Sequence, residues 1–201
     1  MILDRKALKV PIKLNTRKPR ILLDMDDVIV DFLGAIVKIL NDRNCTNYTI
    51  DQCKTWNLAE HYGEESISIM KEEGFFLNLR PKNDSIEVIK RMYLCGKYDI
   101  RIVTASMPNA YKEKLKWIRK HMPFFNEKHF VSCNDKSSVW GDILIDDAEH
   151  NLIDFAEIGE GIIYDMPHNQ GVSGCFRVFN LKDAEDYIED IFYSKDLKQI
   201  I

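Results

Sequence analysis

The chain has 201 residues and a formal net charge of −4, and 45% of its residues are hydrophobic. This length suits one α/β domain with a small insertion or two small domains, and this hydrophobic content predicts a packed core. The acidic balance argues against a protein that coats a nucleic acid polymer. Five widely spaced cysteines without a C-x-x-C pair suggest neither a zinc ribbon nor a disulfide framework.

The N-terminal part carries no sign of a membrane or export signal. No apolar run approaches the roughly 18 residues that a membrane-spanning helix needs. The apolar pieces of the first 19 residues are short and interrupted by charges, which disfavours a secretory signal. We therefore expect a cytoplasmic protein with no membrane partner, in which residues 1–19 form an arm or an edge piece. The sequence leaves a homodimer possible.

The first strong structural signal is a short apolar run that ends in acids. Residues 21–23 predict a buried strand, and Asp24, Asp26 and Asp27 follow it at once. Carboxylates at the end of a buried strand are costly unless a cation meets them. Ligands also bind at the carboxyl ends of strands in open α/β sheets. We therefore expect a metal and phosphate site that begins at Asp24.

The next fifty residues read as an insertion. Helical spacing of apolar residues predicts a helix that carries Phe32, Leu33, Ile36, Val37 and Leu40. The stretch 41–63 is polar and irregular, and a second helix is expected over 64–73, ending at Gly74. We therefore assign residues 33–82 to a small helical cap over the sheet, and residues 1–32 and 83–201 to the core.

From Asp84 onward, helices and strands alternate. A helix capped by Asp84 or Ser85 is followed by a β-branched strand over 98–104. A second helix is expected to bury Tyr111, Leu115 and Ile118. Further strands are predicted at 129–132, 143–145, 161–164 and, at an edge, 176–179, before a final helix that carries Ala184, Tyr187, Ile188 and Ile191. This alternation predicts a Rossmann-like, mostly parallel sheet with helices on both faces.

Polar residues of matching chemistry stand where these strands end. Besides the acids after residue 23, Thr104-Ala105-Ser106 follows the second strand, Lys136 follows the third, and Asp146-Asp147 follows the fourth. In a parallel sheet these ends share one edge, so the residues can converge. Carboxylates suit Mg²⁺, which prefers oxygen ligands, while a lysine and a hydroxyl can hold phosphate oxygens.

This ordered pattern resembles the haloacid dehalogenase-like phosphohydrolase superfamily, which has D-x-D-x-[TV] after strand one, then a Thr or Ser, a Lys and an acidic pair. The matching residues here are Asp24-Met-Asp26-Asp27-Val28, Thr104, Lys136 and Asp146-Asp147. Within the superfamily, segments around Trp56, residues 74–81 and residues 135–147 are similar to those of 5′(3′)-deoxyribonucleotidases. The resemblance implies a magnesium-dependent phosphomonoesterase acting on small phosphate esters, most of all nucleoside monophosphates.

The resemblance also implies a role for each residue. Asp24 would be the nucleophile that forms an aspartyl-phosphate, and Asp26 the acid and base. Mg²⁺ would lie between the Asp24 carboxylate, the Asp26 carbonyl and Asp147, with Asp146 orienting Lys136. Phosphate would bind to Thr104, Lys136 and the residue after Thr104, here Ala105. Four aromatic residues could line a slot for the base: Phe32, Trp56, Phe75 and Phe76.

Two positions depart from the family pattern. Asp27 stands where the family often has Gly, so a third carboxylate could weaken phosphate binding unless it points away. Ala105 stands where the nucleotidases usually have Ser, so one phosphate hydrogen bond is lost or is supplied by Ser106.

Other interpretations remain open at this stage. The same site could serve a sugar phosphate or phosphoserine, because cap residues decide the substrate. A phospho-signalling module uses a similar residue set, but its acidic pair belongs to the first strand. Lys112, Lys114, Lys116, Arg119 and Lys120 are expected to form a solvated helix face. The histidines show no ligand spacing, although a role for the turn at Pro167-His168 near the site is an alternative.

Overall fold

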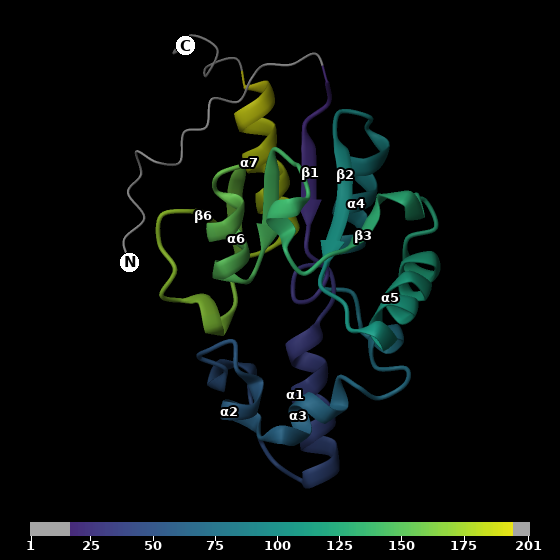
Figure 1. Ribbon diagram of the computed structural model, residues 1–201, viewed down its shortest axis with the longest axis vertical. Helices are drawn as coiled ribbons and strands as arrows, with labels where there is room; N and C mark the ends of the chain where they lie inside the picture. Colours follow the sequence, from purple (N-terminus) through teal and green to yellow (C-terminus); the bar gives the residue numbers. More distant parts are fainter. Residues whose placement is uncertain (1–16, 195–201) are drawn as a thin grey trace.

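The computed structural model of the protein describes residues 17–194 (Figure 1). The expected arm over residues 1–19 lies almost entirely outside the described residues. The strands are β1 (Arg20–Leu23), β2 (Asp99–Thr104), β3 (Phe130–Ser132), β4 (Ile143–Asp146), β5 (Glu160–Tyr164) and β6 (Phe176–Val178). They form one sheet in the order β3-β2-β1-β4-β5-β6, and all five pairings are parallel. The predicted Rossmann-like class is confirmed.

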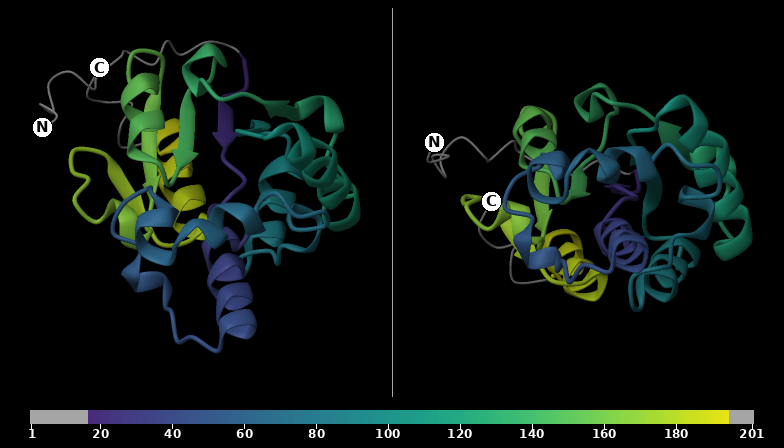
Figure 2. Two further views of the ribbon diagram at one scale, coloured as in Figure 1. Left: turned by 60° about the horizontal axis from the view of Figure 1, so that its bottom comes forward. Right: turned by 90° about the horizontal axis from the view of Figure 1, so that it is seen from below.

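Seven α-helices accompany the sheet in the described part of the chain. They are α1 (Phe32–Asn44), α2 (Leu58–Tyr62), α3 (Glu64–Ile69), α4 (Ser85–Leu94), α5 (Pro108–His121), α6 (Glu149–Phe155) and α7 (Leu181–Tyr193). Seen from below, α4 and α7 lie on one face of the sheet and α6 lies on the other (Figure 2). None of these helices is long and apolar enough to cross a lipid bilayer.

The strands alternate their side chains between two hydrophobic clusters, as the period of two in a β-strand requires. Leu22, Val103, Leu144 and Ile163 pack with Leu152 and Phe155 of α6. Their strand neighbours, such as Ile21 and Ile145, belong to the larger cluster with α1, α4, α5 and α7. Both faces of the sheet are therefore buried, which explains the near-continuous apolar runs of its strands.

The carboxyl ends of the strands point towards α1, α2 and α3 (Figure 1). The chain crosses to these helices through Val30 and returns through Pro81, and the two residues form an antiparallel bridge. Asp31 caps α1 by accepting a hydrogen bond from the Gly34 N–H at 3.2 Å. The described helices of residues 33–82 thus lie beyond the edge where the acids converge, and their assignment as a cap stays a prediction.

Two sequence expectations about this region were wrong. The stretch 41–63 is less irregular than expected, because α1 continues to Asn44 and α2 forms over Leu58–Tyr62. The helix expected over 64–73 ends earlier, at Ile69. Gly74 then adopts a φ of 88°, a left-handed conformation that glycine favours, and leads into the turn of Phe75.

The buried face of α5 also differs from the expected one. Tyr111 is 42% exposed, whereas Ala110, Lys114, Trp117 and Ile118 are buried. The spacing of apolar residues in the sequence is compatible with two different buried faces. The face that is buried in the structure includes the charged Lys114, so the sequence pattern did not favour it. Trp117 is fully buried, and its indole N–H donates to the carbonyl of Leu79 at 2.7 Å.

We expect Trp117→Ala to lower the free energy of unfolding by about 3–5 kcal/mol, because it leaves a cavity and an unpaired carbonyl. Tyr111→Ala on the same helix removes an aromatic ring that is 42% exposed, and we expect it to cost only about 1 kcal/mol. Urea unfolding followed by circular dichroism measures both. Equal losses for the two variants would contradict the burial described for α5.

Candidate active site

The loop after β1 places three acids in three different environments. Asp24 continues the strand, and its N–H donates to the Ile145 carbonyl of β4 at 2.9 Å. Asp27 has a φ of 55°, in the left-handed region where Gly is most at ease and Asp is tolerated. This conformation gives a physical reason for the glycine often found there in similar proteins.

The Asp27 carboxylate binds the start of α1. Its oxygens accept hydrogen bonds from the N–H groups of Phe32 and Leu33, at 3.1–3.2 Å, and so complete the amino end of α1. Burial, followed by the charge of Asp147, raises the pKa of Asp27 to about 8. Lys82 donates to the Asp27 carbonyl at 2.7 Å. The departure at this position therefore serves the fold of the loop.

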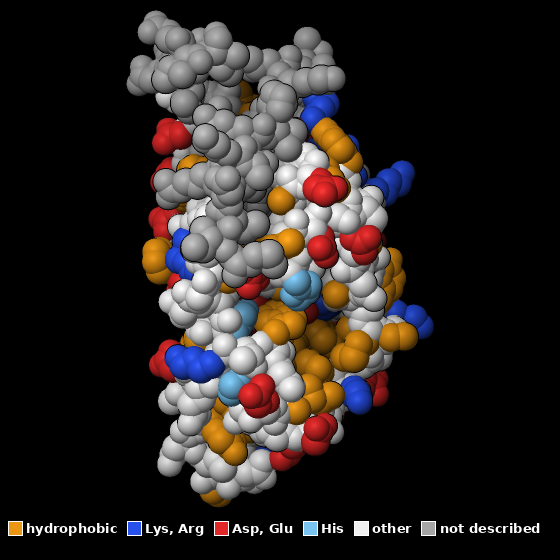
Figure 3. Space-filling view, turned by 60° about the vertical axis from the view of Figure 1, so that its left-hand side comes forward, with side chains coloured by type: hydrophobic (Ala, Val, Ile, Leu, Met, Phe, Trp, Pro, Cys, Tyr) orange, Lys and Arg blue, Asp and Glu red, His pale blue; other side chains and the backbone are white. Residues whose placement is uncertain are grey.

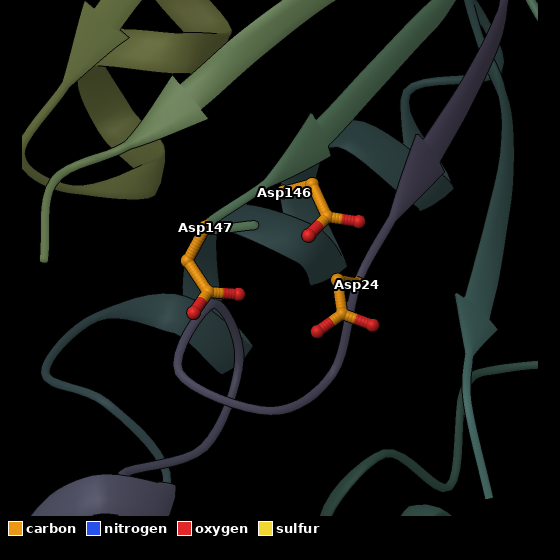
Figure 4. A group of neighbouring side chains, drawn as sticks. All are labelled: Asp24, Asp146 and Asp147. Atoms are coloured by element: carbon orange, nitrogen blue, oxygen red, sulfur yellow. The ribbon is translucent and has the colours of Figure 1, made fainter. Parts of the chain in front are cut away.

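Asp24, Asp146 and Asp147 come together at the carboxyl edge, as expected for the strand ends (Figure 4). Each offers a carboxylate oxygen, and these oxygens lie within 4.8 Å of one another. All three residues are buried. Burial, followed by the charges of Asp146 and Asp24, raises the pKa of Asp147 well above its usual value.

Lys136 meets two of these acids. Its ammonium donates to Asp24 Oδ1 at 2.5 Å and to Asp146 Oδ2. Although burial alone lowers the pKa of Lys136, the two carboxylates raise it above its ordinary value, so the side chain stays charged. Asp146 Oδ1 accepts from the Ala148 N–H and from Asn151, so both oxygens of Asp146 are engaged.

Asp147 differs from Asp146 because its Oδ2 atom is buried and has no hydrogen-bond partner among the described residues. His168 Nε2 lies 3.0 Å away, but the two atoms are not aligned for a hydrogen bond. Asn169 positions the loop by donating to the Asp147 carbonyl at 2.8 Å. The three buried carboxylates face one lysine, so the donor set and its excess negative charge fit a divalent cation.

Lys114 is a site residue that sequence reasoning missed. The predicted solvated face of this helix is wrong at this position, since the side chain of Lys114 is 1% exposed. Its ammonium donates to Asp26 Oδ2 at 2.6 Å, to Thr104 Oγ1 at 2.9 Å and to the Ala105 carbonyl at 2.8 Å. A signal did exist: Lys114 shares the helical spacing of Ala110, Trp117 and Ile118.

The two carboxylate oxygens of Asp26 therefore differ: one is hydrogen-bonded and the other is not. Oδ2 is held by Lys114, whereas Oδ1 is buried without a partner in the described chain. Burial raises the pKa of Asp26, and the charge of Lys114 opposes this rise only in part. Ser106 lies two residues after Thr104, and its Oγ atom is also buried and has no hydrogen-bond partner among residues 17–194. The alanine at position 105 is exposed and offers only its backbone.

The four predicted aromatic residues do not form one slot. Phe32 contacts Phe75 and Phe76 at ring-centroid distances of 5.7 and 6.1 Å. Phe75 and Phe76 are buried, while Phe32 keeps part of its surface. Trp56 packs instead against His168 at 4.5 Å and is 50% exposed. Figure 3 shows hydrophobic side chains gathered around a hollow that histidines border.

Glu113, the neighbour of Lys114, holds the loop that carries Phe75 and Phe76. Its carboxylate accepts from the Gly74 N–H at 2.6 Å and from the Phe76 N–H at 3.1 Å. Consecutive residues of α5 thus contact two parts of the molecule. Glu113 binds the turn of Phe75 and Phe76, and Lys114 binds Asp26 and Thr104.

The chain is similar to known proteins over most of its length. Residues 18–196 match the family described as 5′ nucleotidase, deoxy (pyrimidine), cytosolic type C protein. A Staphylococcus epidermidis protein provisionally named 5′(3′)-deoxyribonucleotidase is 35% identical over 179 residues, which cover 87% of this chain and 98% of that protein. The Bacillus subtilis 5′(3′)-deoxyribonucleotidase is 30% identical over 171 residues, covering 84% and 97%.

Solved structures share the fold at low identity. A haloacid dehalogenase-like protein from Agrobacterium tumefaciens matches with a TM-score of 0.55 and 14% identity, covering 87% of this chain and 99% of that one. A Bacillus subtilis hydrolase of the same type, solved with magnesium bound, matches with a TM-score of 0.52 and 14% identity, covering 89% and 100%. The chain therefore belongs to the 5′ deoxynucleotidase family, shares its fold with haloacid dehalogenase-like proteins, and is a phosphoric monoester hydrolase.

Proposed function

We propose that this protein dephosphorylates deoxyribonucleoside monophosphates through an aspartyl-phosphate on Asp24, with Mg²⁺ as cofactor. The observation that carries the proposal is the buried group of Asp24, Asp146 and Asp147 around Lys136, with oxygens within 4.8 Å. The names of the relatives, two of them 5′(3′)-deoxyribonucleotidases, support the substrate class. The assignment of residues 33–82 as a cap and of a nucleotide as the substrate are parts of the same proposal.

In the first half-reaction a carboxylate oxygen of Asp24 attacks phosphorus, and the bond from phosphorus to the leaving oxygen breaks. Lys136 orients Asp24 through Oδ1. Lys136 and Thr104 hold the phosphoryl oxygens, and the buried hydroxyl of Ser106 supplies the hydrogen bond that a serine at position 105 would give. Positioning and charge stabilisation of this kind do most of the work in phosphoryl transfer.

Asp26 moves the proton. With Oδ2 paired to Lys114, its unpartnered Oδ1 is the atom that gives a proton to the leaving alkoxide. The raised pKa of Asp26 favours the protonated form needed for this step. In the second half-reaction the same oxygen takes a proton from water, which attacks phosphorus and releases Asp24 and phosphate.

Asp24, the Asp26 carbonyl and Asp147 would hold the metal ion. Bound there, Mg²⁺ offsets the repulsion between the attacking carboxylate and the phosphate dianion. Asp146, whose oxygens are engaged by Lys136, Ala148 and Asn151, orients the lysine. Phe32, supported by Phe75 and Phe76, offers a face to the base, where stacking contributes about 1–3 kcal/mol.

The proposal predicts that the protein releases phosphate from deoxyribonucleoside monophosphates faster than from ribonucleotides, sugar phosphates or phosphoserine, and only with Mg²⁺. Asp24→Asn removes the nucleophile, so we expect turnover to vanish while circular dichroism and Tm stay close to those of the parent. Phosphate release across this panel, with and without EDTA, is the measurement. A flat substrate profile would refute the nucleotide assignment, and an active Asp24→Asn protein would refute the nucleophile.

Metal binding can be tested without turnover. Because a ligand that binds only the folded state stabilises it, Mg²⁺ at about a hundred times its Kd should raise Tm by roughly 5–10 °C. Asp147→Asn weakens the site and should abolish most of this shift. Asp42→Asn, an exposed acid paired with Lys38, is the matched control and should keep it. An unchanged shift in Asp147→Asn would remove this residue from the ligand set.

The role of Lys114 predicts a split between kcat and KM. Lys114→Met releases Asp26 Oδ2 and Thr104, and we expect kcat to fall about a hundredfold, with a much smaller change in KM, because proton transfer contributes about 10²–10⁴. Lys116→Met, two positions along and exposed, is the control and should stay near the parent. Folding is checked by circular dichroism at the assay temperature. A rise in KM at constant kcat would assign Lys114 to substrate binding alone.

A further inference from the structure

A second pocket lies at the opposite edge of the sheet, where β1 and β2 begin. It has a volume of about 450 Å³, and its lining includes Arg17, Lys18, Arg20, Tyr93, Arg101 and Trp140. Arg20 is the first residue of β1, so the strand separates this amino-edge pocket from Asp24 by roughly 13 Å. No residue of the candidate active site takes part in it. Its volume falls within the range of small-molecule sites.

The lining is cationic in an acidic protein. Four basic side chains, Arg17, Lys18, Arg20 and Arg101, face the charges of Asp99 and Asp142, whereas the whole chain has a net charge of −4. Asp99 is shared, because it accepts from Arg20 at 2.8 Å and also from Arg101. The four basic groups therefore exceed these two acids by two positive charges, and the pocket favours an anion.

The guanidinium groups keep donors for such an anion. Within residues 17–194, the side chain of Arg20 donates through Nε, and that of Arg101 through Nε and Nη2. Lys18 is exposed; its carbonyl accepts from Arg17 Nη1 at 3.3 Å, but its ammonium makes no hydrogen bond or ion pair with the described part of the chain. Two partly occupied arginines and one lysine form a group that can bind several phosphate oxygens at once.

Aromatic surface lies beside these cations. Trp140 is 43% exposed, and the Arg17 guanidinium stacks on its indole at 3.6 Å. Tyr93 lines the same pocket, and its hydroxyl is 3.2 Å from His129 Nδ1. An aromatic plane next to an arginine group suits a ligand that combines a planar ring with phosphates. A bare phosphate would fill little of the volume.

We propose that the amino-edge pocket is a second, non-catalytic nucleotide site. The phosphates bind to Lys18, Arg20 and Arg101, and the base lies against Trp140 beside the stacked Arg17. The site takes a nucleoside polyphosphate, since its cations outnumber what one phosphate group can engage. It is independent of the chemistry at Asp24.

The three tryptophans of the chain allow a direct test. In Trp56→Phe/Asp24→Asn protein, the remaining tryptophans are the fully buried Trp117 and the exposed Trp140, and turnover is removed. We expect ATP to quench the fluorescence saturably. Lys18→Gln/Arg101→Gln in this background should weaken ATP binding by about tenfold or more, because charge-assisted hydrogen bonds are lost. Lys112→Gln/Lys116→Gln removes the same charge from the exposed surface of α5 and should bind as the parent does.

Each other outcome overturns the proposal. Absence of a saturable quench excludes the site, and equal ATP affinity in the Lys18/Arg101 variant places the nucleotide elsewhere. Tripolyphosphate that binds as tightly as ATP excludes a role for the base. Lys18→Gln alone removes an ammonium that has no partner in the described chain, so it guards against a folding defect in the double variant and should weaken ATP binding several-fold. Because turnover is absent in this background, the result is independent of the proposed phosphatase function.

Discussion

The structure depends on how buried negative charge is distributed at the carboxyl edge of the sheet. Asp24, Asp26, Asp27, Asp146 and Asp147 follow two neighbouring strands, and burial raises the pKa of four of them. Two buried lysines compensate part of this negative charge. Lys136 pairs with Asp24 and Asp146, and Lys114 pairs with Asp26. Uncompensated charges of this kind are costly in a protein interior, so the edge is stable only with its cations in place.

Each acid is set apart by what its oxygens touch. The carboxylate of Asp27 accepts hydrogen bonds from the amino end of α1. The carboxylate of Asp146 accepts hydrogen bonds from Lys136, Ala148 and Asn151. Asp26 and Asp147 each retain a buried oxygen without a hydrogen-bond partner among the described residues. Unsatisfied buried polar atoms are rare. Four such side-chain atoms occur among the described residues, and two of them, Asp26 Oδ1 and Asp147 Oδ2, are the atoms at which a proton and a metal ion are proposed to act. The local environment thus separates similar residues into different functions.

Helix α5 connects this edge with the rest of the molecule. Glu113 holds the turn of Phe75 and Phe76, Lys114 holds Asp26 and Thr104, and Trp117 binds the Leu79 carbonyl. The three contacts lie within five residues of one helix. The packing of α5 therefore fixes the turn of Phe75 and Phe76 relative to Asp26 and Thr104.

The sequence by itself determined the parallel α/β fold and the gathering of Asp24, Thr104, Lys136 and Asp146-Asp147, because strand-end residues of a parallel sheet necessarily share an edge. It did not reveal Lys114 or Glu113, whose charges indicated a surface position until helix packing directed them inward, and it gave His168 near the site only as an alternative. The sequence also did not predict that Trp56 lies apart from Phe32, or that Asp27 binds the start of α1. Both features depend on how the loops of residues 24–31 and 45–57 fold back. Residue order along strands is a local property, whereas the direction of a side chain from a helix or loop is decided only by what packs against it.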